Sequence, residues 1–236
     1  MNKILPALVL SLIVLTAQAQ PPKVVISQVF GAGGLTGSPL SHDFVELFNA
    51  SDEAVVLDGW SIQYSPATNN RWATGTVNLT WIIKPGHYYL IQLNGKEGIG
   101  KPLPEADLVA TVNVDISATS GKVALVNTIA ALQGNCPAAK ELVDFVGFGT
   151  ADCFEGAVAP ATSNSRSIMR ISNGCADSEN NATDFTAVAP GPRNSRSAAN
   201  LCNGGSITVA AVTGLPFCIT NNNEASGVVS FVGNRS

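Results

Sequence analysis

The residues whose types could do chemistry first come together in HDFVE, at positions 42–46. His42, Asp43 and Glu46 offer one imidazole and two carboxylates, the groups most used in general acid–base catalysis. The apolar residues between and after them indicate a β-strand, in which successive side chains face opposite sides. Asp43 and Glu46 then point away from each other, whereas a catalytic acid and base need mutual reach. The stretch therefore favours a structural role.

Recognised catalytic motifs are also missing from the sequence. It contains no G-x-S-x-G nucleophile elbow, no H-E-x-x-H zinc motif and no P-loop. The glycine-rich GAGG at 31–34 lacks the spacing of a dinucleotide-binding loop, and strand-like residues follow it. We therefore expect a chain that is not an enzyme, has no catalytic residues and takes no cofactor other than the calcium ion considered below.

The elements that surround HDFVE follow a strand-and-turn pattern. Trp60, Ile62 and Tyr64 alternate with Ser61 and Gln63, which gives one bulky apolar face. The composition, with 22 Gly, 13 Pro and 13% charged residues, suits a domain with many turns. Regular turn signals between short strands predict an all-β sandwich with long loops. The strands expected are residues 24–30, 44–48, 55–57, 60–64, 77–83, 88–93, 107–114, 122–127, 142–148 and 167–171.

The first residues have the pattern of a secretory signal peptide. A lysine is followed by a short apolar run and then by small residues, so we expect a signal peptide over 1–19 with cleavage between Ala19 and Gln20. A retained membrane anchor is the alternative. No later stretch is long and apolar enough to span a membrane. The sequence thus predicts a secreted protein, extracellular or at the cell surface.

The charge of the chain argues against nucleic acid as a partner. The formal net charge is −4, and the basic residues form no block. Binding to a phosphate backbone depends on several clustered basic residues that release counter-ions. The expected partner is therefore an extracellular or cell-surface ligand, either a protein or a polysaccharide.

Several runs resemble the lamin tail domain family in its bacterial, secreted form. They are VVISQVF, HDFVELFNASDEAVVLDGWSIQY, IIKPGHYYLIQL, ATSGKVALVN, VDFVGFGTADCFEG and ATDFTAVAPGPRNS, which together cover about residues 23–196. The most specific part holds Glu46, Asn49, Leu57, Gly59 and Trp60. The resemblance implies an immunoglobulin-like β-sandwich, here residues 20–199, that acts as a non-catalytic binding or attachment module with an unknown ligand.

The five cysteines of an exported chain indicate disulfide bonds. Cys136 and Cys153 flank the strand expected at 142–148, and Cys175 and Cys202 flank the last run of the resemblance. These two pairings are favoured and leave Cys218 over. Other pairings of the four remain open, as does a set of buried free thiols.

The run CADSENNATDF is the best candidate for a metal site. Asp177, Glu179, Asn181 and Asp184 offer closely spaced oxygen ligands of the kind that calcium takes. Ala182 and Val188 stand where an EF-hand loop needs glycine and glutamate, so the run is not an EF-hand. A solvated turn is the alternative.

The aromatic residues leave a sugar-binding face open as a further alternative. Trp60 heads an alternating run and is expected in the core, because large aromatic side chains most often fill the interior of a sandwich. Trp72 lies in the polar run PATNNRWATG and is expected at the surface.

A new alternating pattern begins after the Asn- and Gly-rich linker. Residues 200–236 are expected to hold this linker and the start of a second, incomplete β-module, because so short a segment buries too little apolar surface to fold alone. The chain could then be the accessory N-terminal region of an extracellular nuclease or phosphatase whose catalytic domain is missing. This is the alternative to an autonomous binding module.

Overall fold

The computed structural model describes residues 23–202. The expected signal peptide with its cleavage point at Ala19 and Gln20, the tail beyond residue 202 and Cys218 lie outside the described residues.

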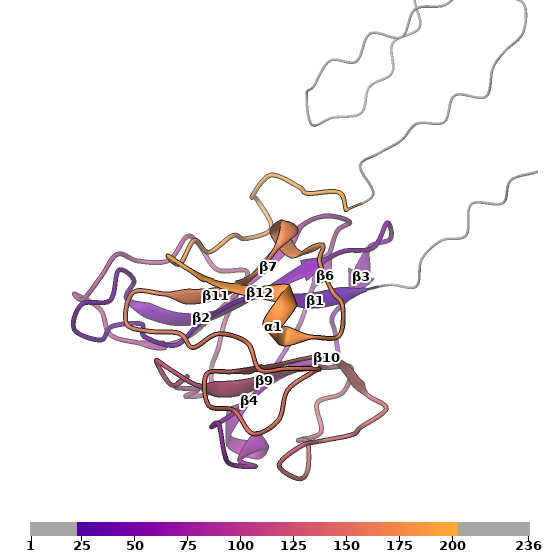
Figure 1. Ribbon diagram of the computed structural model, residues 1–236. Coiled ribbons are helices and arrows are strands. Elements are labelled where there is room, and N and C mark those ends of the chain that lie inside the picture. Colours follow the sequence, from indigo (N-terminus) through magenta and orange to yellow (C-terminus); the bar gives the residue numbers. More distant parts are fainter. Residues whose placement is uncertain (1–22, 203–236) are drawn as a thin grey trace, which may run out of the picture.

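Two β-sheets pack face to face, and a small ribbon stands beside them (Figure 1). The larger sheet has the strand order β12 (Phe185–Val188), β11 (Ser167–Arg170), β1 (Val24–Phe30), β2 (His42–Asn49), β7 (Tyr88–Gly95) and β8 (Leu108–Val109). The smaller sheet has the order β10 (Leu142–Phe148), β9 (Gly121–Val126), β4 (Ser61–Ser65) and β5 (Thr76–Asn78). The ribbon pairs β3 (Val55–Val56) with β6 (Ile82–Ile83). The predicted all-β sandwich is confirmed.

The main core lies between the two sheets. On β2, Val45 and Leu47 enter this core, while Phe44 and Phe48 on the opposite face pack in two smaller apolar clusters. Loops therefore cover the outer face of the larger sheet at this strand. Because both faces are covered, β1 and most of β2 are buried along their length. The hydrophobic run of β1 is typical of a strand covered on both sides.

Two of the expected strands are shorter than predicted. The stretch 77–83 divides into β5 and β6, because Trp81 takes a φ of +83° that no strand residue adopts. Of the stretch 107–114, only Leu108–Val109 pairs as a strand.

The strand β12 and three short helical turns were not predicted. The turns are η1 (Trp72–Gly75), η2 (Ser172–Gly174) and α1 (Asn181–Asp184), and the side chain of Asn180 caps α1. Each is too short for the periodicity of a helix to show in the sequence.

Candidate binding surface

Asp43 and Glu46 lie on opposite faces of β2 and serve different parts of the fold. Asp43 is 2% exposed and accepts hydrogen bonds from the backbone N–H groups of Gly33 (2.7 Å) and Ile116 (2.9 Å). Burial raises the pKa of Asp43 to about 7. His42 contacts Ser41 and the exposed Glu97 instead. His42, Asp43 and Glu46 are therefore not brought together into one site.

Glu46 anchors the segment that follows β12. Its carboxylate accepts from the backbone N–H of Arg193 (2.6 Å) and forms an ion pair with the Arg193 guanidinium (2.7 Å). The guanidinium also lies 3.8 Å from the ring of Tyr88 and donates to its hydroxyl. Burial raises the pKa of Glu46, and the Arg193 cation opposes that shift. This arrangement ties the segment around residue 193 to the larger sheet.

The other residues of the specific run build the turns beside Glu46. The Asn49 side chain donates to the carbonyls of Glu53 and Ile83 and accepts from Ser51, so it holds the turn between β2 and β3. Leu57 is buried in the main core, and Trp60 packs against that core while partly exposed. Gly59 has a φ of +82°, which the tight turn between β3 and β4 requires.

Three of the four oxygen-bearing residues of the candidate calcium loop bind protein groups, and the fourth, Glu179, is exposed. Asp177 pairs with Lys23 (2.5 Å) and Arg170 (3.0 Å), and Asp184 accepts from the backbone and hydroxyl of Ser178. Asn181 is directed away from the loop, toward the backbone of β10. Glu179 lies in the left-handed region, with a φ of +56°.

Arg170 takes the central place among the carboxylates that could hold a metal. Oxygen atoms of Asp144, Glu155 and Asp177 lie within 4.8 Å of one another. Both oxygens of Asp144, however, accept from the fully buried Arg170, which also pairs with Asp177 and with Asp184. Burial, followed by the charge of Asp144, raises the pKa of Glu155 to about 8. A guanidinium thus supplies here the positive charge that a cation would bring.

Two disulfides close loops on the outer faces of the two sheets. Cys136 pairs with Cys153 and Cys175 with Cys202, the two pairings that the sequence favoured. Such bonds persist in an oxidising compartment. Within residues 23–202, no helix has the length and apolar character needed to cross a membrane.

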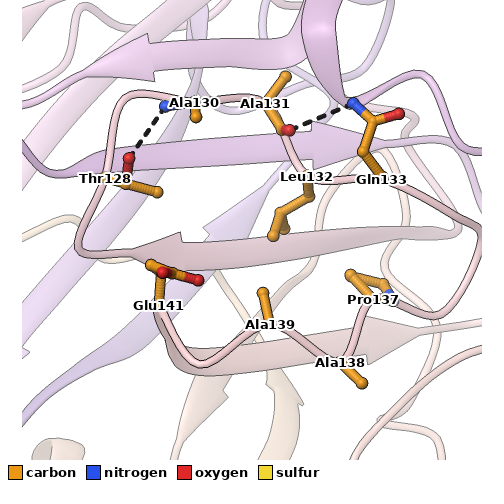
Figure 2. A pocket seen from close by; sticks show the side chains of 9 residues that line it. All are labelled: Thr128, Ala130, Ala131, Leu132, Gln133, Pro137, Ala138, Ala139 and Glu141. Atoms are coloured by element: carbon orange, nitrogen blue, oxygen red, sulfur yellow. Dashed lines mark hydrogen bonds between the residues drawn. The ribbon is translucent and has the colours of Figure 1, made fainter.

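The loop bonded through Cys136 forms a shallow cavity of about 420 Å³ (Figure 2). Four of its nine lining residues are alanines, and Leu132 is directed toward the underlying strands. Two of the polar groups in view bond within the loop itself: the N–H of Ala130 donates to Thr128, and Gln133 donates to the carbonyl of Ala131. Within the described part of the chain, the carboxylate of Glu141 pairs only with the neighbouring Lys140. A small-molecule site usually has polar groups that converge on the ligand. This cavity offers little to recognise one.

The expected surface position of Trp72 is wrong. Trp72 is fully buried, donates from Nε1 to the carbonyl of Gly134 (2.8 Å) and packs near Phe145. The ammonium of Lys122, which is also buried, lies 5.8 Å from its ring. The disulfide-bonded loop, distant in sequence, folds over the polar run that contains Trp72. Its burial therefore depends on a contact that the local sequence does not show.

Trp81 is the tryptophan that faces solvent, with 70% of its surface exposed. Its φ of +83° places a bulky residue in the left-handed region, which such residues rarely adopt. Two hydrogen bonds hold it there: the Trp81 N–H donates to Asp58 (2.9 Å), and the Leu57 N–H donates to the Trp81 carbonyl (2.8 Å). The indole is therefore presented to solvent from a fixed backbone.

Two aliphatic side chains extend this exposed surface. Val56 and Ile82 are direct partners on β3 and β6, and they are 55% and 40% exposed. The bond between Leu57 and Trp81 makes the neighbouring Val56–Ile82 pair a non-hydrogen-bonded pair, in which cross-strand side chains lie closest. Val56, Trp81 and Ile82 together form what we call the Trp81 patch. Sequence analysis missed it, although three apolar residues beside a turn were a visible signal.

The comparison with known proteins gives the family. The model of the Lamin Tail Domain matches residues 17–150, more than half of the chain. No curated protein matches. The matched region ends before β11 and β12, yet both strands complete the larger sheet. The buried Arg170 and the partly buried Arg193 also lie beyond it. The chain belongs to the Lamin Tail Domain family.

Proposed function

We propose that this protein is a secreted, non-catalytic binding or attachment module and that the Trp81 patch is its contact surface. The observation that carries the proposal is the exposed Trp81, held in a strained backbone conformation. A bulky residue in the left-handed region costs about 1–3 kcal/mol, and such strain is concentrated at functional sites. A fold that only needed a turn between β5 and β6 would be more stable with glycine at this position.

The chemistry of the patch suits a macromolecular partner. Tryptophan is enriched among the residues that dominate binding free energy, and apolar neighbours help to exclude water around it. The charged and amide side chains favour a binding role over a catalytic one, because they are already used to hold the fold together. Glu46, Asn49, Asp177 and Asp184 are occupied by hydrogen bonds or ion pairs within the fold. The two disulfides, with the signal-peptide pattern, support a location outside the cell.

The test is a binding array on the purified chain, with polysaccharides, cell-envelope proteins and DNA at physiological salt. Wild-type protein is compared with Trp81→Ala and with Ile129→Ala, a matched control because Ile129 is 56% exposed on a different loop. We expect saturable binding that weakens at least tenfold in Trp81→Ala and is unchanged in Ile129→Ala. Chelation with EDTA should leave binding unchanged, because Arg170 occupies the acidic cluster.

Two results would overturn the proposal. Equal binding by wild type and Trp81→Ala would place the contact surface elsewhere. A clean negative across the array would remove the autonomous binding role. Because Trp81 is exposed, Trp81→Ala should unfold at the same temperature as wild type, which separates lost binding from lost structure.

A further inference from the structure

We infer that the outer edge of β5 is a second binding site, which takes an uncharged, extended peptide segment of a partner protein as an added strand. β5 is the edge strand of the smaller sheet and pairs on one side only, with β4. The site is separate from the Trp81 patch and goes beyond the proposed function, since it uses backbone groups rather than an exposed indole.

The ladder between β4 and β5 shows which backbone groups face outward. The N–H of Leu79 donates to the carbonyl of Trp60, so these two residues form a hydrogen-bonded pair. Pairs of this type alternate along an antiparallel ladder, which makes Ile62 and Val77 the next one. The N–H and C=O groups of Thr76 and Asn78 therefore point away from β4. Within residues 23–202, these four groups have no hydrogen-bond partner.

A cleft of about 130 Å³ runs along this open edge. One wall is β5, and the other is the segment from β8 to Val112, at the edge of the larger sheet. Val109 and Val112 on that wall are 56% and 46% exposed. A strand paired with Thr76 and Asn78 would carry alternate side chains toward these valines, because side chains of a strand alternate between its two faces.

The absence of charged residues from the cleft indicates which kind of peptide would fit it. Its full lining is Thr76, Val77, Asn78, Leu108, Val109, Ala110, Thr111 and Val112. None of these residues is charged and none is proline, although proteins usually protect edge strands with lysine, proline or a bulge. A neutral apolar wall beside four free backbone groups complements a neutral segment with β-branched residues at alternate positions. A charged segment would lose its hydration there without gaining a partner.

The experiment uses the full purified chain and a labelled seven-residue peptide of alternating valine and threonine with Gly-Ser ends. Two variants at one position isolate the backbone. Asn78→Pro removes the outward N–H and keeps the bonds to β4, since proline is tolerated on an edge strand. Asn78→Thr changes the side chain and keeps the N–H. We expect binding by wild type and Asn78→Thr within twofold of each other, and at least about fivefold weaker binding by Asn78→Pro.

Amide hydrogen exchange distinguishes peptide binding at this edge from a purely structural role of β5, because only binding would slow exchange when the peptide is added. The peptide should slow exchange at Thr76 and Asn78 and leave Val77, already bonded to β4, unchanged. Trp81→Ala should bind the peptide as wild type does, so the two sites can fail independently. The inference is overturned if Asn78→Pro binds equally, if the peptide with lysine in place of valine binds equally, or if no binding is seen. Wild-type dimerisation that Asn78→Pro abolishes would instead assign the edge to a second copy of the chain.

Discussion

The Trp81 patch and a second region, which we call the Arg170 cluster, differ in how each uses its residues. The cluster consists of Arg170 and the carboxylates around it, those of Asp144, Glu155, Asp177 and Asp184. Around Arg170, charged side chains are buried and bonded to one another, with Asp144 3% exposed and Arg170 fully buried. At the patch, apolar side chains are exposed and only the backbone is held in place. Residue types that suggest chemistry are thus used here for structure, while residue types that suggest a core are left available for contact. Charge alone is a poor guide to function when every buried polar group must find a partner.

The largest predicted effect is on the Arg170 cluster. Replacing Arg170 with methionine leaves Asp144 buried without its counter-charge, which should lower the free energy of unfolding by about 3–5 kcal/mol. Urea denaturation measures the loss. Arg196→Met is the matched control: Arg196 pairs with Glu105 in full solvent, and its removal should have no measurable effect. Similar losses in both variants would show that the buried ion pairs contribute no more to the free energy of unfolding than an exposed one.

The pH dependence of stability tests the same cluster. The pKa of Glu155 rises from 4.5 to about 8 on folding, so the folded chain keeps a proton that the unfolded chain has released. The free energy of unfolding should therefore fall as pH rises through this window. Glu155→Gln, which does not titrate, should flatten the dependence. Some slope should remain, because Asp43 has a pKa of about 7 and acts in the same direction. An unaltered slope in the variant would contradict this.

The smallest effect is expected at the patch, and it has the opposite sign. Trp81→Gly relieves the strained backbone and should raise the free energy of unfolding by up to about 1 kcal/mol, while it removes the contact side chain. Thermal unfolding and the binding array are read on the same preparation. Higher stability with lost binding would show that the strain serves contact rather than folding. Lower stability would mean that the indole contributes to packing, which argues against the patch.

Much of the fold could be predicted because it depends on local pattern. The alternation around Trp60 and the turn residues Asn49 and Gly59 predicted strands and turns that the structure contains. The opposite directions of Asp43 and Glu46 follow from the geometry of one strand. Family resemblance and the β-sandwich are confirmed by the family match and the sheets.

The features that could not be predicted depend on distant partners. Trp72 is buried by a loop whose Gly134 lies 62 residues away, and Glu46 meets Arg193 across 147 residues. Trp81 is exposed because its backbone turns into a region that sequence periodicity does not encode. Strand patterns give the direction of a side chain, but they do not show which loop will cover it.

The Cys175–Cys202 disulfide has a consequence for how the domain carries load. Tension applied between residues 23 and 202 enters through β1 at one end and passes through the disulfide to Cys175, just after β11, so that residues 176–201 bear none of it. β1 and β11 are antiparallel neighbours, so both are pulled from the same end. Their hydrogen bonds are then loaded one after another, behind the Lys23–Asp177 ion pair. Under force, β1 and β11 therefore separate one hydrogen bond at a time, starting from the end at which the force is applied.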